Sequence, residues 1–163
     1  MKPSTFTLLS DASGDAMGGF VLGPVSGSGT WWRFQCDDDV HARLRATGRD
    51  WNELSINVLE LLGMVATPSI FVTQSDARPN YARDTSLMRG DMSAVQWVSK
   101  RRGGREPRSG ALMRLLGCLE VGSGWCFDAL HVAGMENTIA DGISRWEPED
   151  IDGNLRAFRP DVA

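Results

Sequence analysis

Four acidic side chains stand where a fold could bring them together into one reactive site: Asp11, Glu60, Asp91 and Asp141. Asp11 ends a strand-like apolar run, and Asp141 belongs to residues 131–146, HVAGMENTIADGISRW, which open a helix after another apolar run. Clustered carboxylates repel one another, and divalent cations are the usual remedy. Two such ions about 3.5–4 Å apart can activate a water and stabilise the leaving oxygen in phosphodiester hydrolysis. The acids therefore indicate metal-dependent chemistry on a phosphodiester.

Each acid also has a purely structural interpretation. Glu60 interrupts the apolar run VLELL, where a carboxylate is costly unless it is paired or bound to a metal, but it could also face solvent at the edge of a helix. Asp91 could be only the N-cap of a helix. Asp141 could form an i,i+4 pair with Arg145. Asp11 could be a turn former, so the argument depends on the four acids together.

The composition limits the kind of metal site. The chain has 163 residues, 42% of them hydrophobic and 23% charged, which is typical of one soluble globular domain. Three widely spaced cysteines (Cys36, Cys118 and Cys126) without a CxxC pair argue against a disulfide framework or a zinc ribbon and fit a reducing compartment. With only two histidines, a metal has to be held by oxygen ligands, which favours magnesium or manganese.

The N-terminus has one lysine and a short apolar patch, too little for a signal peptide. No apolar run approaches the roughly 18 residues of a membrane span. We therefore expect an intracellular protein, in the cytoplasm or nucleus, without a transmembrane segment.

One basic segment stands out in a chain whose net charge is −4. Residues 100–114 hold a single acid, Glu106, and six basic residues: Lys100, Arg101, Arg102, Arg105, Arg108 and Arg114. An acidic protein with such a segment can still dock a polyanion locally. A solvated loop without a partner is the alternative interpretation.

The predicted elements place the four acids at the ends of strands and on helices. Alternating and helical apolar spacings predict strands at residues 5–10, 16–22, 30–35, 86–89 and 125–132, and helices at residues 50–68 (stopped by Pro68), 91–99, 111–121 and 136–146. Strands that are separated by helices in the second half imply parallel pairing there, so the sheet should be mixed. We expect one domain over residues 1–146 and a tail or linker outside the core over residues 147–163.

Five blocks of the sequence resemble the ribonuclease H domain of retrotransposon reverse transcriptases, particularly those of gypsy-like and DIRS-like elements. The blocks occur in the order of that family: SDASGDAMGGFVLG, SINVLELLGMVA, LMRGDMSAVQWVSK, REPRSGALMRLLGCLE and HVAGMENTIADGISRW. The resemblance implies an α/β, ribonuclease H-like fold with a five-stranded mixed sheet in the order 3-2-1-4-5, flanked by helices. It also implies an endonuclease that hydrolyses the RNA strand of RNA–DNA hybrids.

The resemblance assigns the four acids to the metal site. Asp11 would bridge two Mg²⁺ ions, for which Mn²⁺ can substitute, Glu60 and Asp91 would hold the ion on the nucleophile side, and Asp141 would hold the other. The partners implied are the hybrid and the polymerase part of a parent polyprotein, with no membrane. The candidate nucleic-acid contacts are Lys100, Arg101, Arg102, Arg105 and Arg108, with Ser13 and Asn137 near the acids.

Departures from the family keep other functions open. Met92 follows the third acid, where the family commonly has asparagine, and Ala133 replaces a frequent proline. His131, at a strand end, is expected to be structural rather than catalytic. The alternatives are a catalytically weak or inactive module that binds hybrid nucleic acid, and a structural domain of a reverse transcriptase.

Overall fold

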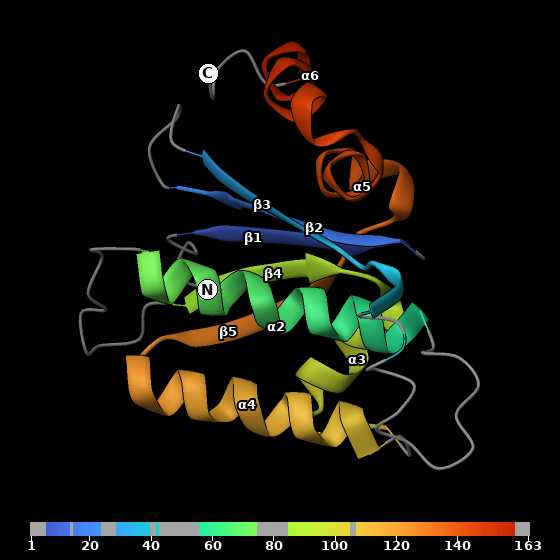
Figure 1. Cartoon of the computed structure of the whole chain (residues 1–163). Coiled ribbons are helices and arrows are strands. Elements are labelled where there is room, and N and C mark those ends of the chain that lie inside the picture. The colour runs from blue at the N-terminus through green and yellow to red at the C-terminus, as the bar shows by residue number, and fades with distance from the viewer. Residues whose placement is uncertain are drawn as a thin grey trace.

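The protein forms a five-stranded sheet with helices on both faces (Figure 1). The computed structural model describes residues 6–13, 15–23, 29–39, 42, 56–74, 85–104 and 107–158. The strands are β1 (Thr7–Ala12), β2 (Ala16–Leu22), β3 (Gly29–Gln35), β4 (Thr85–Gly90) and β5 (Cys126–His131). They lie in the order β3-β2-β1-β4-β5, which confirms the predicted order.

The sheet is mixed, as expected. β1 and β2 pair antiparallel, as do β2 and β3, whereas β1–β4 and β4–β5 are parallel pairs. Because parallel strands end at the same edge of a sheet, the carboxyl ends of β1 and β4 lie together. Asp11 near the end of β1 and Asp91 just after β4 are therefore brought to one edge by the strand pairing alone.

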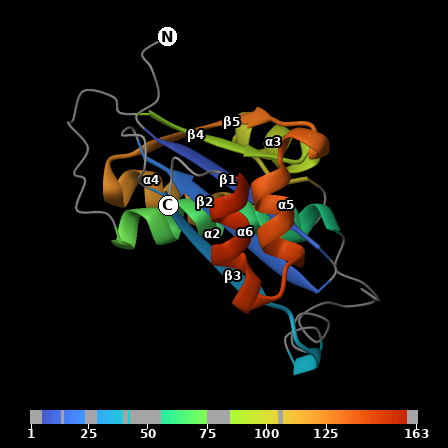
Figure 2. The same ribbon diagram turned by 90° about the horizontal axis from the view of Figure 1, so that it is seen from above.

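Two helical layers cover the sheet (Figures 1 and 2). One face carries α2 (Ile56–Gln74), α3 (Met92–Ser99) and α4 (Pro107–Ser123). The other face carries η1 (Gly134–Glu136), α5 (Thr138–Arg145), η2 (Pro148–Asp150) and α6 (Ile151–Phe158). Each face of β1 is therefore packed against a different layer, and both layers can deliver side chains to its end.

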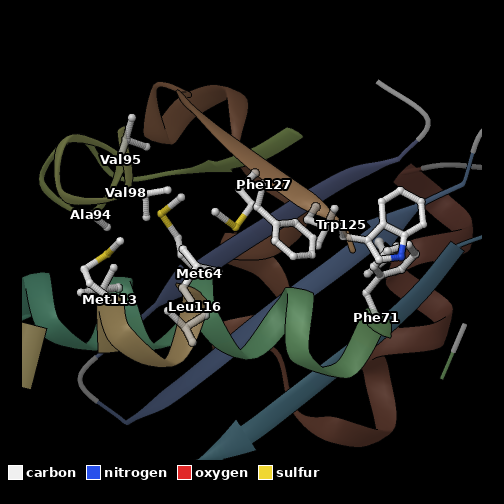
Figure 3. Close-up of a cluster of buried hydrophobic side chains, with 14 residues drawn as sticks. Met64, Phe71, Ala94, Val95, Val98, Met113, Leu116, Trp125 and Phe127 are labelled. Carbon is white, nitrogen blue, oxygen red and sulfur yellow. The ribbon is translucent and has the colours of Figure 1, made fainter. Parts of the chain in front are cut away.

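The larger core lies between the sheet and α2, α3 and α4 (Figure 3). Met64, Leu116 and Phe127 are at most 1% exposed at its centre. Phe71 and Trp125 close one end, with their rings tilted edge-on at a centroid distance of 5.2 Å. Aromatic pairs of this geometry add to the stabilisation that burial alone provides.

α2 is the central helix of this core. The expectation that no apolar run approaches 18 residues is wrong for this helix: its window Ile56–Thr73 is long and apolar enough to cross a membrane by length and composition, but 56% of that window is buried inside the fold. The same helix carries the buried Glu60 and packs on β1. The core helix of a globular domain can have the same length and composition as a membrane-spanning helix, and burial to this extent is typical of such a core helix.

The prediction that Pro68 ends this helix is wrong, because α2 continues to Gln74. Proline cannot donate to the carbonyl four residues earlier, which costs about 3 kcal/mol or more in a helix interior. The hydroxyls of Thr67 and Ser69 donate to the carbonyls of Gly63 and Val65 and support this turn. The last turns are held by tertiary packing, since Phe71 is only 5% exposed in the core.

The expectation that the segment after residue 146 lies outside the core is wrong for α6. Ile151 is fully buried in a second cluster with Leu9, Phe20 and Ile143, between the sheet and α5. The Trp31 indole also donates to Asp152 at 2.8 Å. Residues 159–163 lie outside the described part, and the predicted domain boundary at residue 147 stays a prediction.

Replacing Ile151 with alanine is expected to lower the free energy of unfolding by about 2–4 kcal/mol, because it leaves a cavity in a fully buried cluster. Urea unfolding followed by circular dichroism measures the change. Val121→Ala is the matched control, since Val121 is 88% exposed and its truncation should change stability by less than about 0.5 kcal/mol. Equal effects of the two substitutions would show that α6 does not belong to the folded core.

Candidate active site

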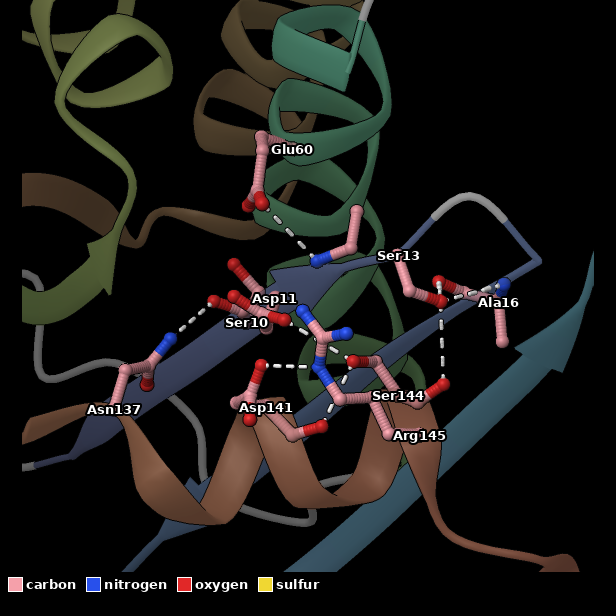
Figure 4. A network of polar contacts seen from close by, with 10 residues as sticks. Ser10, Asp11, Ser13, Ala16, Glu60, Asn137, Asp141, Ser144 and Arg145 are labelled. Carbon is pink, nitrogen blue, oxygen red and sulfur yellow. Dashed lines mark hydrogen bonds and ion pairs between the residues drawn. The ribbon is translucent and has the colours of Figure 1, made fainter. Parts of the chain in front are cut away.

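Asp11 lies near the end of the central strand and points to the α5 side of the sheet. Side chains alternate along β1, so Ser10 faces α2, where its Cβ would lie 3.5 Å from a Cβ added at Gly63, whereas Leu9 and Asp11 face α5. The Ser144 hydroxyl donates to Asp11 Oδ2 at 3.1 Å and lies 2.9 Å from the carbonyl of Asp141 (Figure 4). Ser144 thereby ties Asp11 to α5.

A glycine on the neighbouring strand allows this close approach. Gly18 is the antiparallel partner of Asp11 in β2. A Cβ atom added at Gly18 would lie 2.6 Å from Ile143 Cγ2 and 2.9 Å from the backbone nitrogen of Ser144. Any larger residue would therefore push α5 away from the sheet, and with it the hydroxyl that holds Asp11.

Glu60 reaches the same strand end from α2, on the opposite face of the sheet. It is 6% exposed, and its Oε1 accepts a hydrogen bond from the backbone N–H of Ala12 at 3.3 Å. Its Oε2 is buried, and among the described residues it has no hydrogen-bond partner. A buried carboxylate oxygen without a donor is costly, so this position favours a proton or a cation.

The four acids are close enough to affect one another's charge. The pKa of Glu60 is raised from 4.5 to about 8, mainly by burial and also by charge repulsion from Asp11, Asp91 and Asp141, while the hydrogen bond from Ala12 opposes the shift. The pKa of Asp11 is raised from 3.8 to about 6, mainly by burial and also by the charges of Asp141 and Asp91, while the Ser144 hydrogen bond and the charge of Arg145 oppose the shift. Carboxylates that disfavour one another's charge are the arrangement that divalent cations stabilise.

Two of these acids already have structural partners, as their alternative interpretations predicted. Asp91 caps α3, with Oδ1 accepting from the backbone N–H of Ser93 at 2.7 Å. Asp141 Oδ1 lies 2.6 Å from Nε of Arg145, in an i,i+4 ion pair on α5. Asp91 and Asp141 nevertheless still raise the pKa values of Asp11 and Glu60, so having a structural partner does not exclude either acid from the candidate site.

The acids converge without forming a ready-made cage. Within the described residues, no group of three or more histidine, cysteine, aspartate or glutamate side chains is placed to hold a metal ion. The donor set nevertheless fits a hard divalent cation, because every candidate ligand is a carboxylate. The unpartnered Oε2 of Glu60 also gives that cation a buried oxygen to bind.

The basic segment is only partly available for nucleic acid. Arg101 pairs with Glu120 at 2.9 Å and donates to the carbonyl of Phe127, which ties the end of α3 to α4 and β5. Lys100 and Arg102 are exposed in the turn after α3, and Arg108 is half-buried on α4. Arg105 lies outside the described residues. Phosphate contact by these residues stays a prediction.

The other two predicted contact residues serve the fold. Asn137 is 4% exposed, and its amide donates to the carbonyl of Ser10 at 3.0 Å, so it joins the start of α5 to β1. A side chain that is buried in this way is poorly placed to contact nucleic acid directly. The sequence placed Asn137 near the acids but did not reveal that its side chain points inward. The Ser13 hydroxyl closes the β1–β2 turn on Ala16.

His131 ends β5 and is exposed, with Nδ1 3.3 Å from the carbonyl of Gly90. Gly90 is also its register partner in β4. The contact supports the structural role that was expected for this histidine.

Ser144 is the residue of this site that sequence reasoning missed. Replacing it with alanine is expected to raise the pKa of Asp11 further above 6, because the lost hydrogen bond stabilises the charged carboxylate. Carbon-13 NMR of the aspartate carboxyl groups in metal-free protein measures this titration. Ser69→Ala, whose hydroxyl donates to Val65 on α2, is the control and should leave Asp11 unchanged. An unaltered Asp11 titration in Ser144→Ala would contradict the contact.

Comparison with known proteins supports the fold. No protein-family model matches the sequence, and no curated protein is similar to it. The structure is similar to that of RNase H1 from the archaeon Halobacterium salinarum, with 14% identity and a TM-score of 0.54 over 91% of this chain and 98% of that one.

It is also similar to the N-terminal RNase H domain of rv2228c from Mycobacterium tuberculosis, with 14% identity and a TM-score of 0.56 over 94% and 97% of the two chains. At such identity the likeness concerns the fold and not the activity. The chain has a ribonuclease H-like fold.

Proposed function

We propose that this protein is a metal-dependent endoribonuclease that hydrolyses the RNA strand of RNA–DNA hybrids. The observation that carries the proposal is that Asp11, Glu60, Asp91 and Asp141 come together around the end of β1, where their repulsion contributes to the raised pKa values of Asp11 and Glu60. A charge cluster of this kind has no evident purpose in a merely structural domain, because it destabilises the fold. Strongly shifted carboxylates that share one site are typical of catalytic centres.

The same four acids would hold two Mg²⁺ ions, or Mn²⁺ in their place. When bound, the ions supply Lewis-acid stabilisation and lower the pKa of a bound water. The protein's own contribution is to hold the ligands. Ser144 fixes Asp11 from α5, and the backbone of Ala12 fixes Glu60 from β1. Rigid supports of this kind on strands and helices reduce the reorganisation that the reaction requires.

The substrate class follows from charge and from the resemblance of the sequence blocks. Lys100 and Arg102 are exposed and could contact phosphates, which gives affinity without sequence preference. Recognition of the RNA strand would depend on 2′-hydroxyl contacts and on the shape of the minor groove. We further propose that the domain acts in a retroelement, beside the polymerase part of a reverse transcriptase, inside the cell.

A cleavage assay tests the proposed activity. Labelled RNA in an RNA–DNA hybrid is expected to be cut internally in Mg²⁺ or Mn²⁺ and to stay intact in EDTA. Single-stranded RNA, RNA duplex and DNA duplex of the same sequence are the controls and should be cut far less. An intact hybrid in both metals, with protein that is folded by circular dichroism, would refute the activity.

A catalytically inactive binding module is the second candidate, and two observations favour it. Asp91 and Asp141 are already engaged by Ser93 and Arg145, and Met92 is 46% exposed directly beside Asp91. This module would bind the hybrid with an affinity that falls steeply with salt. Salt-dependent hybrid binding without any cleavage, in the presence of polymerase sequence as well as in its absence, would identify it.

A further inference from the structure

Arg145 is a cation set among the acids of the candidate active site. It lies one turn after Asp141 on α5, and its Nε contacts Asp141 Oδ1 at 2.6 Å. The ion pair with Asp141 raises the pKa of Arg145, and the charges of Asp11 and Glu60 raise it further. Figure 4 shows the guanidinium directed back along α5 toward Asp11 and Asp141 instead of away from the protein.

The exposure of the Arg145–Asp141 ion pair favours a contact that can be broken over a permanent structural one. Its side chain is 61% exposed and that of Asp141 is 42% exposed, so water surrounds much of the pair. Exposed i,i+4 ion pairs are weak and are screened by salt. A second ion pair, Arg101–Glu120, lies on the opposite helical layer and is reinforced by the hydrogen bond from Arg101 to Phe127. Within the part of the chain that the structure describes, Arg145 makes no second hydrogen bond of this kind.

A divalent ion and Arg145 compete for the carboxylate of Asp141. Oδ1 of Asp141 can accept the guanidinium or bind a metal ion, and a positive charge held over Asp11 and Asp141 also repels an incoming cation. Removing the charge of Arg145 should therefore strengthen binding of the divalent ion in two ways: Oδ1 of Asp141 becomes available as a ligand, and the repulsion of the incoming ion becomes weaker.

We propose that Arg145 is the built-in counter-ion of the carboxylate site: it pairs with Asp141 while no divalent ion is bound, and it sets the ion concentration at which the site fills. The inference rests on the proposed function only in assuming that the four acids bind divalent ions. It makes Arg145 a positioning residue, which holds Asp141 in place and releases it when the ion arrives.

Isothermal calorimetry with Mn²⁺ alone, without nucleic acid, tests this role. Arg145→Gln and Arg145→Met remove the charge and are expected to bind Mn²⁺ about threefold to tenfold more tightly than the wild type. Arg145→Lys keeps the charge and should bind like the wild type. Arg156→Gln is the matched control, since it removes an exposed arginine from the last turn of α6, and it should leave Mn²⁺ binding unchanged.

A second measurement excludes a general loss of structure. In metal-free buffer the two neutral variants should melt at a lower temperature than Arg156→Gln, because the acids have lost their counter-ion. The difference should close at saturating Mn²⁺.

The outcomes separate this inference from the proposed function. Wild-type protein that binds Mn²⁺ together with neutral variants that bind it no more tightly would overturn the counter-ion role and leave the metal site standing. Neutral variants that raise the KM for hybrid at unchanged Mn²⁺ affinity would also overturn it, and would make Arg145 a phosphate contact. Wild-type protein that binds no Mn²⁺ would overturn both proposals together.

Discussion

Replacing Asp11 with asparagine is expected to reduce hydrolysis of the RNA strand by about a hundredfold to a thousandfold, the scale of loss when one preorganised electrostatic group is removed from an active site. Asp11 is the central acid of the site: it repels Glu60 from one side and is itself repelled by Asp141 and Asp91. The substitution removes a charge and a metal ligand but keeps an oxygen that can accept from Ser144. The rate of hybrid cleavage in single-turnover assays measures the effect.

The same substitution should not harm the fold. At pH 7.5 Asp11 is mostly charged, since its pKa is about 6, so neutralising it relieves repulsion and should leave the metal-free protein at least as stable as the wild type. Asp15→Asn is the matched control, because Asp15 is an exposed aspartate just across the β1–β2 turn. Full activity in Asp11→Asn, or an equal loss in Asp15→Asn, would contradict the assignment of Asp11.

Replacing Glu60 with glutamine is expected to remove much of the pH dependence of stability in the metal-free protein. The folded protein raises the pKa of Glu60 to about 8 from an ordinary value of 4.5. Between these pH values the folded state therefore holds a proton that the unfolded state has released. The contribution of Glu60 to the free energy of unfolding is fully present below about pH 4.5. It is lost as the pH rises to about 8, by up to ~1.4 kcal/mol per pH unit.

Urea unfolding at several pH values in EDTA measures this dependence. Glu60→Gln should match the wild type near pH 4.5 and be more stable by several kcal/mol near pH 8.5, while its carbonyl can still accept from Ala12. Mg²⁺ should stabilise the wild type at high pH and the variant far less. Glu120→Gln, on α4 at the far ion pair, is the control for a lost carboxylate. Parallel stability curves for wild type and Glu60→Gln would contradict the burial of a charge at this position.

The grouping of the acids could be predicted because it depends on strand order and on simple periodicity. Alternation in β1 fixes the face of Asp11, and the parallel pairing of β1 with β4 fixes the edge at which Asp91 emerges. Apolar spacing around Glu60 put that residue on a helix that packs on the sheet. The periodic patterns are carried by a few neighbouring residues, whereas the order of the strands was implied by the resemblance of the sequence blocks.

The misjudged elements are those in which distant contacts outweigh local preference. Pro68 is a local helix breaker, and the packing of Phe71 against Phe6 and Trp125 helps α2 to continue past it. Ile151 follows acids and a proline, and its place in the second core depends on Phe20 and Ile143 from other elements. Contacts between residues so far apart leave no periodic pattern in a short segment.

The orientation of the site's side chains could be predicted only in part. The spacing of Asp141 and Arg145 predicts their ion pair, which the structure confirms. The hydroxyl of Ser144 on Asp11 depends on how closely α5 approaches the sheet, and Gly18, 126 residues earlier in the chain, permits that approach. A glycine in a strand shows that something comes close, but its identity requires the folded structure.

The central claim, that these four acids form a divalent-metal site, is tested most directly by crystals soaked in millimolar Mn²⁺ and measured for anomalous scattering. We expect Mn²⁺ peaks bonded to the carboxylates of Asp11 and Glu60, with Asp91 and Asp141 completing the ligands and Asp141 turned from Arg145. Soaked crystals in which these carboxylates are clear of lattice neighbours and yet carry no anomalous peak would contradict the claim.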